Sequence, residues 1–457
     1  TYPSGDYTVV EFQGAGECTW TVPSNVTKVD VLAVGGGGGG GAWIGGGGGG
    51  GGVTDTSVTA PSGVTVTPGS QISVTVGAGG SGAIKNNDGS LTEGTHGGTS
   101  TFGTSSPVTA LGGGVGASWN AQAAGSGAEI ASGGGGSQTT GTYGGGTGQT
   151  SNGGAASTNN RPYPTGGGGG AGGDGGDGNA STDCGVGVGG AGGPGASSSL
   201  AGTVVHYGGG GGGAVHGTVA GTGGCVSSLS WTSGAGGIGG GATGASANSA
   251  DDTPTAASGT DGLGGGGGGA ATVYFADSSL TKTSQGGDGG NGVVIVRYLS
   301  RSITINAGNN QTGLPSQDLS TDPQVRVTDA DGNGIDDVSV SFAVASGGGS
   351  VRSSSVTTSG GGYASTKWTL GNASPTQTLT VTSDGAGGSP LTFTASTLYS
   401  LSYDANEGSS PPAKQTAVDG GDLVVAAAGS MSRSGYTFDS WNTAADGSGT
   451  TYEPTDT

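Results

Sequence analysis

The strand-like segment Val31-Leu32-Ala33-Val34 runs directly into seven glycines, 35–41, and after Ala42-Trp43-Ile44 a second glycine run follows, 45–52. Glycine makes up 115 of the 457 residues, whereas an average protein has roughly 7%. Such runs cannot form an ordinary helix, because each glycine there costs about 1 kcal/mol relative to alanine. They also lack the side chains that pack a β-strand. They are therefore either disordered linkers or an arrangement that only glycine permits.

Two features favour the ordered arrangement. Large apolar residues interrupt the glycine-rich region, and strand-like segments bracket it; the interrupting residues include Trp43, Ile44, Tyr143, Tyr163, Tyr207 and Trp231. Collagen is excluded, because it needs glycine at every third position with abundant proline, and here the runs are unbroken and only 16 prolines occur. We expect a bundle of left-handed, three-residue-per-turn polyglycine II helices, which pack closely and exchange N–H···O bonds supplemented by Cα–H···O contacts.

The net negative charge of the chain excludes some classes of binding partner. The formal net charge is −20 with only 11 Lys and Arg, and the isoelectric point is about 4.1. Nucleic acid and anionic lipid surfaces are therefore unfavourable partners. No apolar stretch reaches the roughly 20 residues of a membrane span, so we expect no membrane insertion. The acidic, Ser/Thr-rich composition is typical of a secreted protein, in which the negative charge serves either solubility or divalent-cation binding between subunits.

The cysteine count is odd, so the three cysteines cannot all pair within the chain. Cys184 and Cys225 both lie in the glycine region, where a disulfide between them would join one loop to another. Cys18 would then be free or bonded to another molecule. A zinc site is not expected, because the chain has no CxxC spacing and only three histidines.

Residues 1–299 hold the glycine between β-rich segments. The expected strands cover 7–12, 18–22, 28–34, 64–67, 71–76, 99–103, 107–111, 271–275 and 292–298. The opening Trp20-Thr21-Val22-Pro23 and the closing Gly286-Gly287-Asp288-Gly289-Gly290-Asn291-Gly292, followed by Val293-Val294-Ile295-Val296, resemble the bacterial and phage glycine-rich domain. This resemblance implies a jelly-roll-like β-sandwich with a polyglycine II bundle, an exported and interaction-related role, and no catalytic residues.

Two further β-rich modules are expected, which makes the chain all-β. Alternating segments in 300–397 indicate an Ig-like sandwich, and the order of its motifs resembles the invasin/intimin-type module; the segments are 324–328, 338–344, 364–370, 377–382 and 391–395. Residues 398–457 resemble the Listeria–Bacteroides repeat of internalin B type. That resemblance implies a small β-grasp-like module, which we expect to be incomplete at its C-terminus.

Acidic clusters offer two candidate cation sites. Asp329, Asp331 and Asn333 alternate as in an EF-hand loop, and Asp336 follows. A full EF-hand is excluded because position twelve is Val340 rather than Glu. The cluster is therefore either a partial Ca²⁺ site or a hairpin turn rich in Asp, Asn and Gly. Asp174 and Asp177 are likewise either cation ligands or solvated tips between glycine helices.

Catalytic chemistry is not expected, so we predict that the protein is not an enzyme and needs no cofactor, with Ca²⁺ as the one candidate ligand. No Ser, His and Asp pattern marks a nucleophile, and no phosphate-binding Gly-x-x-x-x-Gly-Lys-[Ser/Thr] occurs. The aromatic residues between glycine runs either cap the bundle or present a surface for a glycan or protein, with Trp43 and Trp231 as the candidate partner-binding residues.

These observations lead to three functional hypotheses. The first is a structural protein of the bacterial surface, self-associating into a filament, sheath or layer, with the strand at 7–12 added to the sheet of the next subunit. The second is a cell-surface adhesin that binds glycan or protein through loops of the glycine-rich head. The third is a phage receptor-binding adhesin.

Overall fold

The computed structural model describes residues 1–4, 7–23, 26–59, 63–119, 122–138, 144–158, 162–180, 186–216, 231–247, 255–272, 283–329, 332–418 and 421–457. The chain divides into two compact units, Thr1–Leu299 and Ser300–Thr457. Within the described residues the only α-helix is α1 (Thr56–Thr59), and the other assigned elements are β-strands. The all-β prediction is therefore confirmed.

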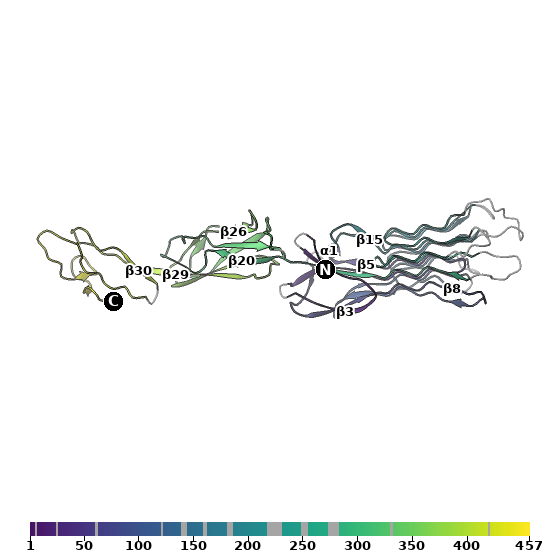
Figure 1. The fold of residues 1–457 in the computed structure, drawn as a ribbon, viewed down its shortest axis with the longest axis horizontal. Helices are drawn as coiled ribbons and strands as arrows, with labels where there is room; N and C mark the ends of the chain where they lie inside the picture. The colour runs from purple at the N-terminus through teal and green to yellow at the C-terminus, as the bar shows by residue number, and fades with distance from the viewer. Residues whose placement is uncertain are drawn as a thin grey trace. The chain divides into compact units, whose positions relative to one another are not determined.

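The first unit begins with a two-sheet sandwich (Figure 1). Its larger sheet has the order β1 (Tyr2–Ser4), β2 (Tyr7–Phe12), β19 (Val293–Leu299), β4 (Lys28–Val34) and β5 (Val53–Asp55), and β6 (Val64–Thr65) also pairs with β4. Its smaller sheet has the order β11 (Val108–Ala110), β10 (Ser100–Phe102), β7 (Gln71–Val76) and β3 (Gly16–Thr21). Antiparallel pairing of β19 with both β2 and β4 brings the two ends of the unit together at the centre of the larger sheet.

Both faces of the larger sheet are buried, because successive apolar side chains of its central strands point to opposite sides. Val29 and Val31 pack with Trp20 and Phe102 between the two sheets. The opposite face of the same strands joins a second cluster, which includes Leu32, Val34, Ile295, Leu200 and Tyr207. This double burial explains why 28–34 and 293–296 read as nearly continuous apolar runs.

The N-terminal strand is not available for addition to a neighbouring subunit. Along β2, the residues from Tyr7 to Val9 pair with β1, and those from Tyr7 to Phe12 pair with β19. The expectation that Tyr7–Phe12 joins the next subunit is therefore wrong, because this strand lies inside its own sheet. The edge strand there is the three-residue β1.

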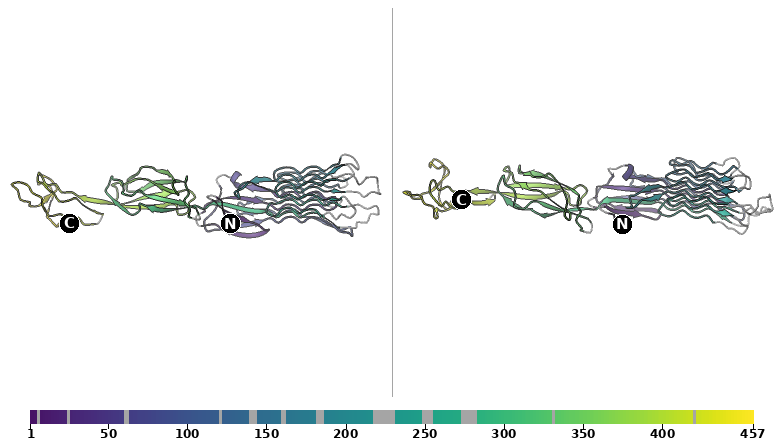
Figure 2. Two further views of the ribbon diagram at one scale, coloured as in Figure 1. Left: turned by 45° about the horizontal axis from the view of Figure 1, so that its top comes forward. Right: turned by 90° about the horizontal axis from the view of Figure 1, so that it is seen from above.

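The glycine runs form an ordered bundle rather than linkers (Figures 1 and 2). Along 35–41 the backbone N–H groups address three neighbours in rotation. Those of Gly35, Gly38 and Gly41 donate to the segment 46–52, with N···O distances of 2.8 to 3.0 Å. The N–H groups at 36 and 39 donate to 95–98, and those at 37 and 40 donate to 287–290. A partner that recurs every third residue is the signature of a helix with three residues per turn.

The carbonyl groups of the same segment address three more neighbours. Carbonyls 36 and 39 accept from 113–116, carbonyls 37 and 40 accept from 80–83, and carbonyls 38 and 41 accept from 267–270. Segment 35–41 thus has six hydrogen-bonded neighbours and no side chains. Segments 45–52, 166–170, 208–213 and 264–269 are bonded in the same way, so the all-glycine runs form the interior of the bundle.

Peripheral segments follow a different sequence rule. They read Gly-Gly-x, and the x position faces outward, as Asp174 and Asp177 do in 172–178 and as Ala191 and Pro194 do in 189–195. A three-residue turn explains this spacing, because positions i and i+3 lie on the same side of the helix. The sequence reasoning used the unbroken runs and missed this period of three, although it was visible.

Short strand pairs close the ends of the glycine segments. They are β8 (Ile84–Lys85) with β9 (Leu91–Thr92) and β18 (Ser284–Gln285), β12 (Asn179–Ala180) with β13 (Gly187–Val188), β14 (Ala196–Ser198) with β15 (Val205–Tyr207), and β16 (Val215–His216) with β17 (Ser246–Ala247). A strand was also expected at 271–275. Three of its residues, 273–275, lie outside the described residues.

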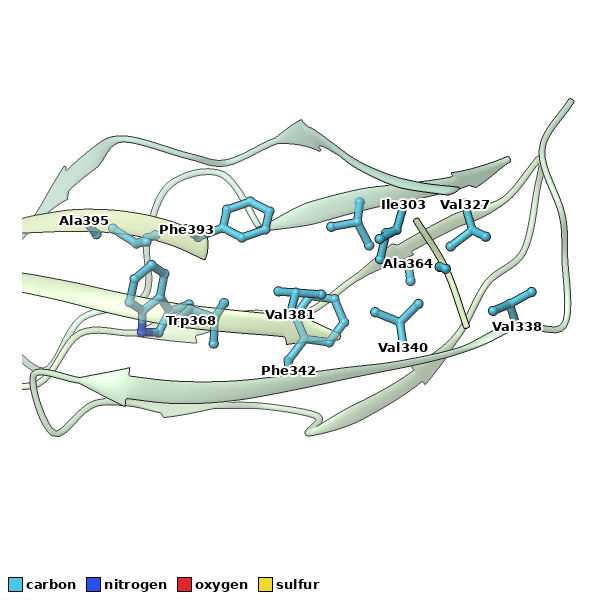
Figure 3. Packing of buried hydrophobic residues seen from close by; sticks show 14 of the residues in the cluster. Ile303, Val327, Val338, Val340, Phe342, Ala364, Trp368, Val381, Phe393 and Ala395 are labelled. Carbon is cyan, nitrogen blue, oxygen red and sulfur yellow. The ribbon is translucent and has the colours of Figure 1, made fainter. Parts of the chain in front are cut away.

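The second unit opens with another sandwich. One sheet has the order β20 (Ser302–Ala307), β22 (Gln324–Thr328) and β26 (Tyr363–Ser365). The other has the order β21 (Gln311–Gly313), β29 (Leu391–Leu401), β28 (Thr376–Thr382), β23 (Ser339–Ser346) and β25 (Ser355–Thr357), with a separate pair β24 (Ser350–Val351) and β27 (Trp368–Thr369). Figure 3 shows inward residues of both sheets, including Val327 of the first and Phe342 of the second, in one core with Trp368 of the separate pair.

The strand expected at 364–370 is instead broken into two. β26 pairs with β22, whereas β27 pairs with β24. Thr366 lies at the break, where its hydroxyl accepts the N–H of Ser353 at 3.0 Å. Changing partners there lets both Ala364 and Trp368 reach the same core.

The C-terminal part of this unit has little core of its own. β30 (Gln415–Val418) pairs with the last residues of β29, and β31 (Trp441–Asn442) pairs with β32 (Thr451–Tyr452). Val425 is the only buried hydrophobic residue in the described part of 402–457. The described residues there contain no helix, so they do not form the sheet-on-helix packing of a β-grasp.

Candidate functional site

Hydroxyl groups hold the turn that joins the two longest glycine runs. The Ala42 N–H donates to Ser118 Oγ at 2.9 Å, and the Trp43 N–H donates to Ser284 Oγ at 3.1 Å. Ser137 Oγ donates to the Ile44 carbonyl, and Thr165 Oγ1 donates to the Gly45 carbonyl. All four hydroxyl residues are buried. They bond to backbone groups of the turn, and the Gly45 carbonyl also accepts the Ala214 N–H at 3.2 Å.

Sequence reasoning missed these hydroxyl residues. Three of them directly adjoin a glycine segment: Ser118 follows 112–117, Ser137 follows 133–136 and Thr165 precedes 166–170. Ser284 is separated from 286–290 by one residue, Gln285. A serine or threonine at the end of a run was thus a readable signal for a capped glycine helix.

Trp43 lies in this turn and is half-buried. It has a positive φ of 46°, and Ile44 has a φ of 57°, which is uncommon for non-glycine residues. Its ring packs edge-on against Trp119, with centroids 4.5 Å apart, and Lys85 Nζ lies 5.1 Å from its centroid. The two half-buried indoles and the cation form an aromatic platform, which we define as Trp43, Trp119 and Lys85.

Trp231 does not belong to this platform. Its side chain is only 8% exposed, so it offers little area to a partner in this structure. Tyr163 also packs inward, with its ring centroid 5.7 Å from that of His216. His216 is fully buried, and burial lowers its pKa to about 4, partly opposed by a hydrogen bond with the backbone of Thr272. Tyr207, at the end of β15 and directly before the run 208–213, packs against the larger sheet of the sandwich, and Tyr143 lies outside the described residues.

Acidic side chains of the bundle accept hydrogen bonds from backbone N–H groups of the neighbouring glycine segment, so they are not solvated tips between helices. Asp174 Oδ1 accepts the N–H of Asn152 at 2.6 Å, and Asp177 Oδ1 accepts that of Ala155 at 2.7 Å. Donors and acceptors are both three residues apart, so one turn of each helix matches one turn of its neighbour. Asp288 accepts the Gly82 N–H in the same manner at 2.8 Å.

The expected calcium cluster is divided between two turns. Asp329 accepts hydrogen bonds from the backbone and side chain of Asn333, as in a turn. Asp336 instead accepts the N–H groups of Gly362 and Gly361 at 2.7 and 2.9 Å, and these bonds lower the pKa of its carboxyl. Asp331 lies outside the described residues. The turn interpretation accounts for these contacts, and Ca²⁺ binding remains a prediction.

The cysteine prediction is not addressed by the described residues. Cys184 and Cys225 both lie outside them, so their pairing stays a prediction. Cys18 is free and exposed on β3.

Neither a metal centre nor a membrane span is found in the part of the chain that the structure describes. No cluster of three or more His, Cys, Asp or Glu side chains is placed to hold a metal ion there. No helix among those residues is long and apolar enough to cross a membrane.

The fold places this protein in a class in which a β-sandwich carries long glycine-rich insertions. These insertions pack together as a polyglycine bundle. Comparison with known families agrees: residues 12–299 match the glycine-rich domain, and the chain belongs to that family. Residues 399–457 match the Listeria-Bacteroides repeat domain, a repeat typical of surface proteins. A search of curated proteins finds no match. The invasin/intimin resemblance of 300–397 remains a prediction.

Proposed function

We propose that this protein is a non-catalytic, exported component of the bacterial surface, and that it is a subunit of a filament, sheath or layer. The observation that carries the proposal is the bundle interior, where each all-glycine segment is bonded to six neighbours through its backbone. Such an interior holds no side chains for chemistry and resists bending, because every segment is tied on all sides. A stiff body of this kind suits a mechanical role. The surface-associated repeat at 399–457 supports the same assignment.

Electron microscopy of the full chain at high concentration tests this role. The experiment compares negatively stained protein in Ca²⁺ with protein in EDTA, because the acidic chain offers carboxylates that Ca²⁺ could bridge. We expect regular filaments, tubes or sheets in at least one condition. Protein that stays dispersed at every concentration, with and without Ca²⁺, would overturn the structural role.

The aromatic platform favours a second function, adhesion to a glycan or protein. Half-buried Trp rings beside a cation are suited to stacking against a sugar or an aromatic side chain. Retention on a glycan array, lost in Trp119→Ala but kept in Tyr399→Ala, would support adhesion. Tyr399 is a suitable control because it is 51% exposed and lies in the other unit. An array on which the wild type binds nothing would argue against glycan adhesion.

A further inference from the structure

Two adjacent outer segments of the bundle each present a row of uncharged side chains, all of them aliphatic except that of Thr232. Segment 188–195 exposes Val188, Ala191 and Pro194, and segment 232–238 exposes Thr232, Ala235 and Ile238. In both segments the exposed residues are three apart, so they lie along one side of a three-residue helix. We call these six residues the aliphatic face.

Backbone hydrogen bonds fix the two rows side by side. The N–H groups of residues 189, 192 and 195 donate to the carbonyls of 232, 235 and 238, with N···O distances of 2.7 to 2.8 Å. The two segments are therefore parallel and in register. The aliphatic face is a continuous part of a wall that the backbone holds rigid.

This face carries no charge, and it differs from the rest of the first unit in how many large apolar side chains it exposes. The net charge is −20, yet the sequence from 185 to 250 has no Asp, Glu, Lys or Arg. Of the five large hydrophobic side chains that are exposed in the described part of Thr1–Leu299, four lie in 186–238. They are Val186, Val188, Val204 and Ile238, and Ile238 is 59% exposed. Apolar exposure is thus concentrated where charge is absent.

We propose that the aliphatic face binds the same face of a second copy of this chain. Two copies with a net charge of −20 repel each other wherever acidic surfaces meet. At the aliphatic face they can approach without bringing carboxylates together, and burying the exposed Val and Ile side chains favours contact. A charged partner would gain nothing from a face that carries no charge.

The neighbouring segments determine the orientation of the pair. On one side, 173–178 carries Asp174 and Asp177 and is bonded to the face through the Gly176 N–H and the Ala191 carbonyl at 2.7 Å. On the other side, 241–245 exposes uncharged Thr243. A two-fold axis parallel to the segments places each acidic row opposite the partner's uncharged row, whereas a two-fold axis across them would oppose the acidic rows. The bundles of the two copies therefore lie parallel.

This inference deepens the proposed structural role, on which it rests, by naming one subunit contact. A contact of a face with itself is isologous and closes into a dimer. A filament or layer would need a second contact in addition.

Sedimentation analysis of the full chain tests the pairing. We expect a monomer–dimer equilibrium that strengthens as salt is raised from 20 to about 500 mM, because salt screens the repulsion between the acidic copies. Ile238→Asp should weaken the dimer at least tenfold, because it brings two carboxylates into the contact. Val424→Asp is the matched control, since Val424 is 47% exposed in the other unit, and it should leave the equilibrium unchanged. Matching thermal melts establish that both variants are folded.

The possible results separate this inference from the proposed function. A wild-type chain that remains monomeric in high salt overturns the pairing, as does a dimer that Ile238→Asp leaves intact. If such a chain still forms regular assemblies in the microscope, the structural role survives without this contact. If the dimer forms and Ile238→Asp dissolves it, but no larger assembly appears, the pairing stands and the polymer proposal fails.

Crosslinking tests the orientation. In a parallel pair, Ile238→Cys places one thiol close to its counterpart in the partner, so mild oxidation should give a covalent dimer. The wild type, which carries the native cysteines, is the control. A dimer that Ile238→Cys does not link, but that a mixture of Ile238→Cys and Val188→Cys chains does, would contradict the parallel arrangement.

Discussion

Gly48 illustrates why the interior segments admit no other residue. A Cβ built on Gly48 would lie 2.1 Å from the Gly38 carbonyl oxygen and 2.8 Å from that of Gly39. Both obstacles are backbone atoms of a neighbouring segment, which cannot move without breaking its own hydrogen bonds. The same is true of Gly37, whose Cβ would lie 2.0 Å from the Gly265 carbonyl oxygen. The requirement for glycine is therefore steric, and it arises from neighbours rather than from local conformation.

Substitution of Gly48 by alanine should severely destabilise the first unit. We expect Gly48→Ala to lower the free energy of unfolding by at least about 3 kcal/mol, because overpacking is added to lost hydrogen bonds. Gly144→Ala is the matched control, since no atom of the described residues lies within 4 Å of a Cβ at that glycine. Chemical denaturation of both variants measures the difference. Equal stability of the two would contradict the close packing.

His216 makes the bundle sensitive to acid. Its pKa is lowered by burial to about 4, below the value of about 6.5 in an unfolded chain. The unfolded state therefore binds the proton more readily, so the stabilisation is complete above pH 6.5 and is lost as the pH falls towards 4. This loss amounts to about 3 kcal/mol.

The variant His216→Gln isolates this effect, because a carboxamide does not titrate. We expect its free energy of unfolding to fall less than that of the wild type between pH 7 and pH 4.5, measured by urea denaturation. Parallel pH profiles for the two proteins would show that His216 does not titrate as a buried group.

At the residue scale, sequence reasoning identified residue types better than their contacts. It singled out Trp43, which does lie at the turn between glycine runs. It could not separate Trp231 from Trp43, because both interrupt glycine in the same way, and only the packed bundle shows that one is buried. Asp329 and Asp336 looked like one cluster in the sequence, but they bond to different turns.

At the scale of elements, the strands were the most predictable part of the fold. The expected ranges 7–12, 28–34 and 71–76 agree with β2, β4 and β7, because β-branched and aromatic residues there are bounded by turns. The strand at 364–370 was not predictable in the same way, since its alternation continues through the point where the chain changes partner. The glycine content predicted the polyglycine II type of helix. It did not predict which segments lie side by side, because that depends on long-range packing.

Thr165 tests whether hydroxyl groups fix the ends of these helices. Its side chain is fully buried, and its Oγ1 accepts the Ala214 N–H at 2.7 Å while donating to the Gly45 carbonyl. Thr165→Val keeps the shape and removes both bonds, so it should cost about 2 kcal/mol. Thr243→Val, at an exposed position, should change stability by less than about 0.5 kcal/mol. Thermal melts that do not distinguish the two variants would argue against a role of the Thr165 hydroxyl in fixing the helix end.

At the scale of the whole molecule, the chain comprises two units stabilised by different means. The first relies on backbone bonds between glycine segments and on its sandwich, whereas the Ig-like part of the second relies on a conventional core around Phe342, Trp368 and Phe393. The change in composition near residue 299 predicted this division. The small core of 402–457 was not apparent from its sequence, since its aromatic residues are as frequent as in a packed module.

The two units should therefore respond separately to mutation. Phe342 is 1% exposed, and Phe342→Ala should cost about 3–5 kcal/mol. We expect calorimetry of the full chain to show separate transitions, and only the transition of 300–457 to shift, by about 10 °C. A shift of every transition by the same amount would mean that the units unfold together.

Hydrogen exchange over residues 31–53 tests most directly the claim that the glycine runs are an ordered, hydrogen-bonded bundle. In this structure each N–H of 35–41 donates to a neighbouring segment. We predict that mass spectrometry of the native full chain will show these amides exchanging roughly a thousandfold more slowly than those of an unstructured glycine peptide. Exchange at the rate of the unstructured peptide would show the runs to be linkers, and would contradict the account.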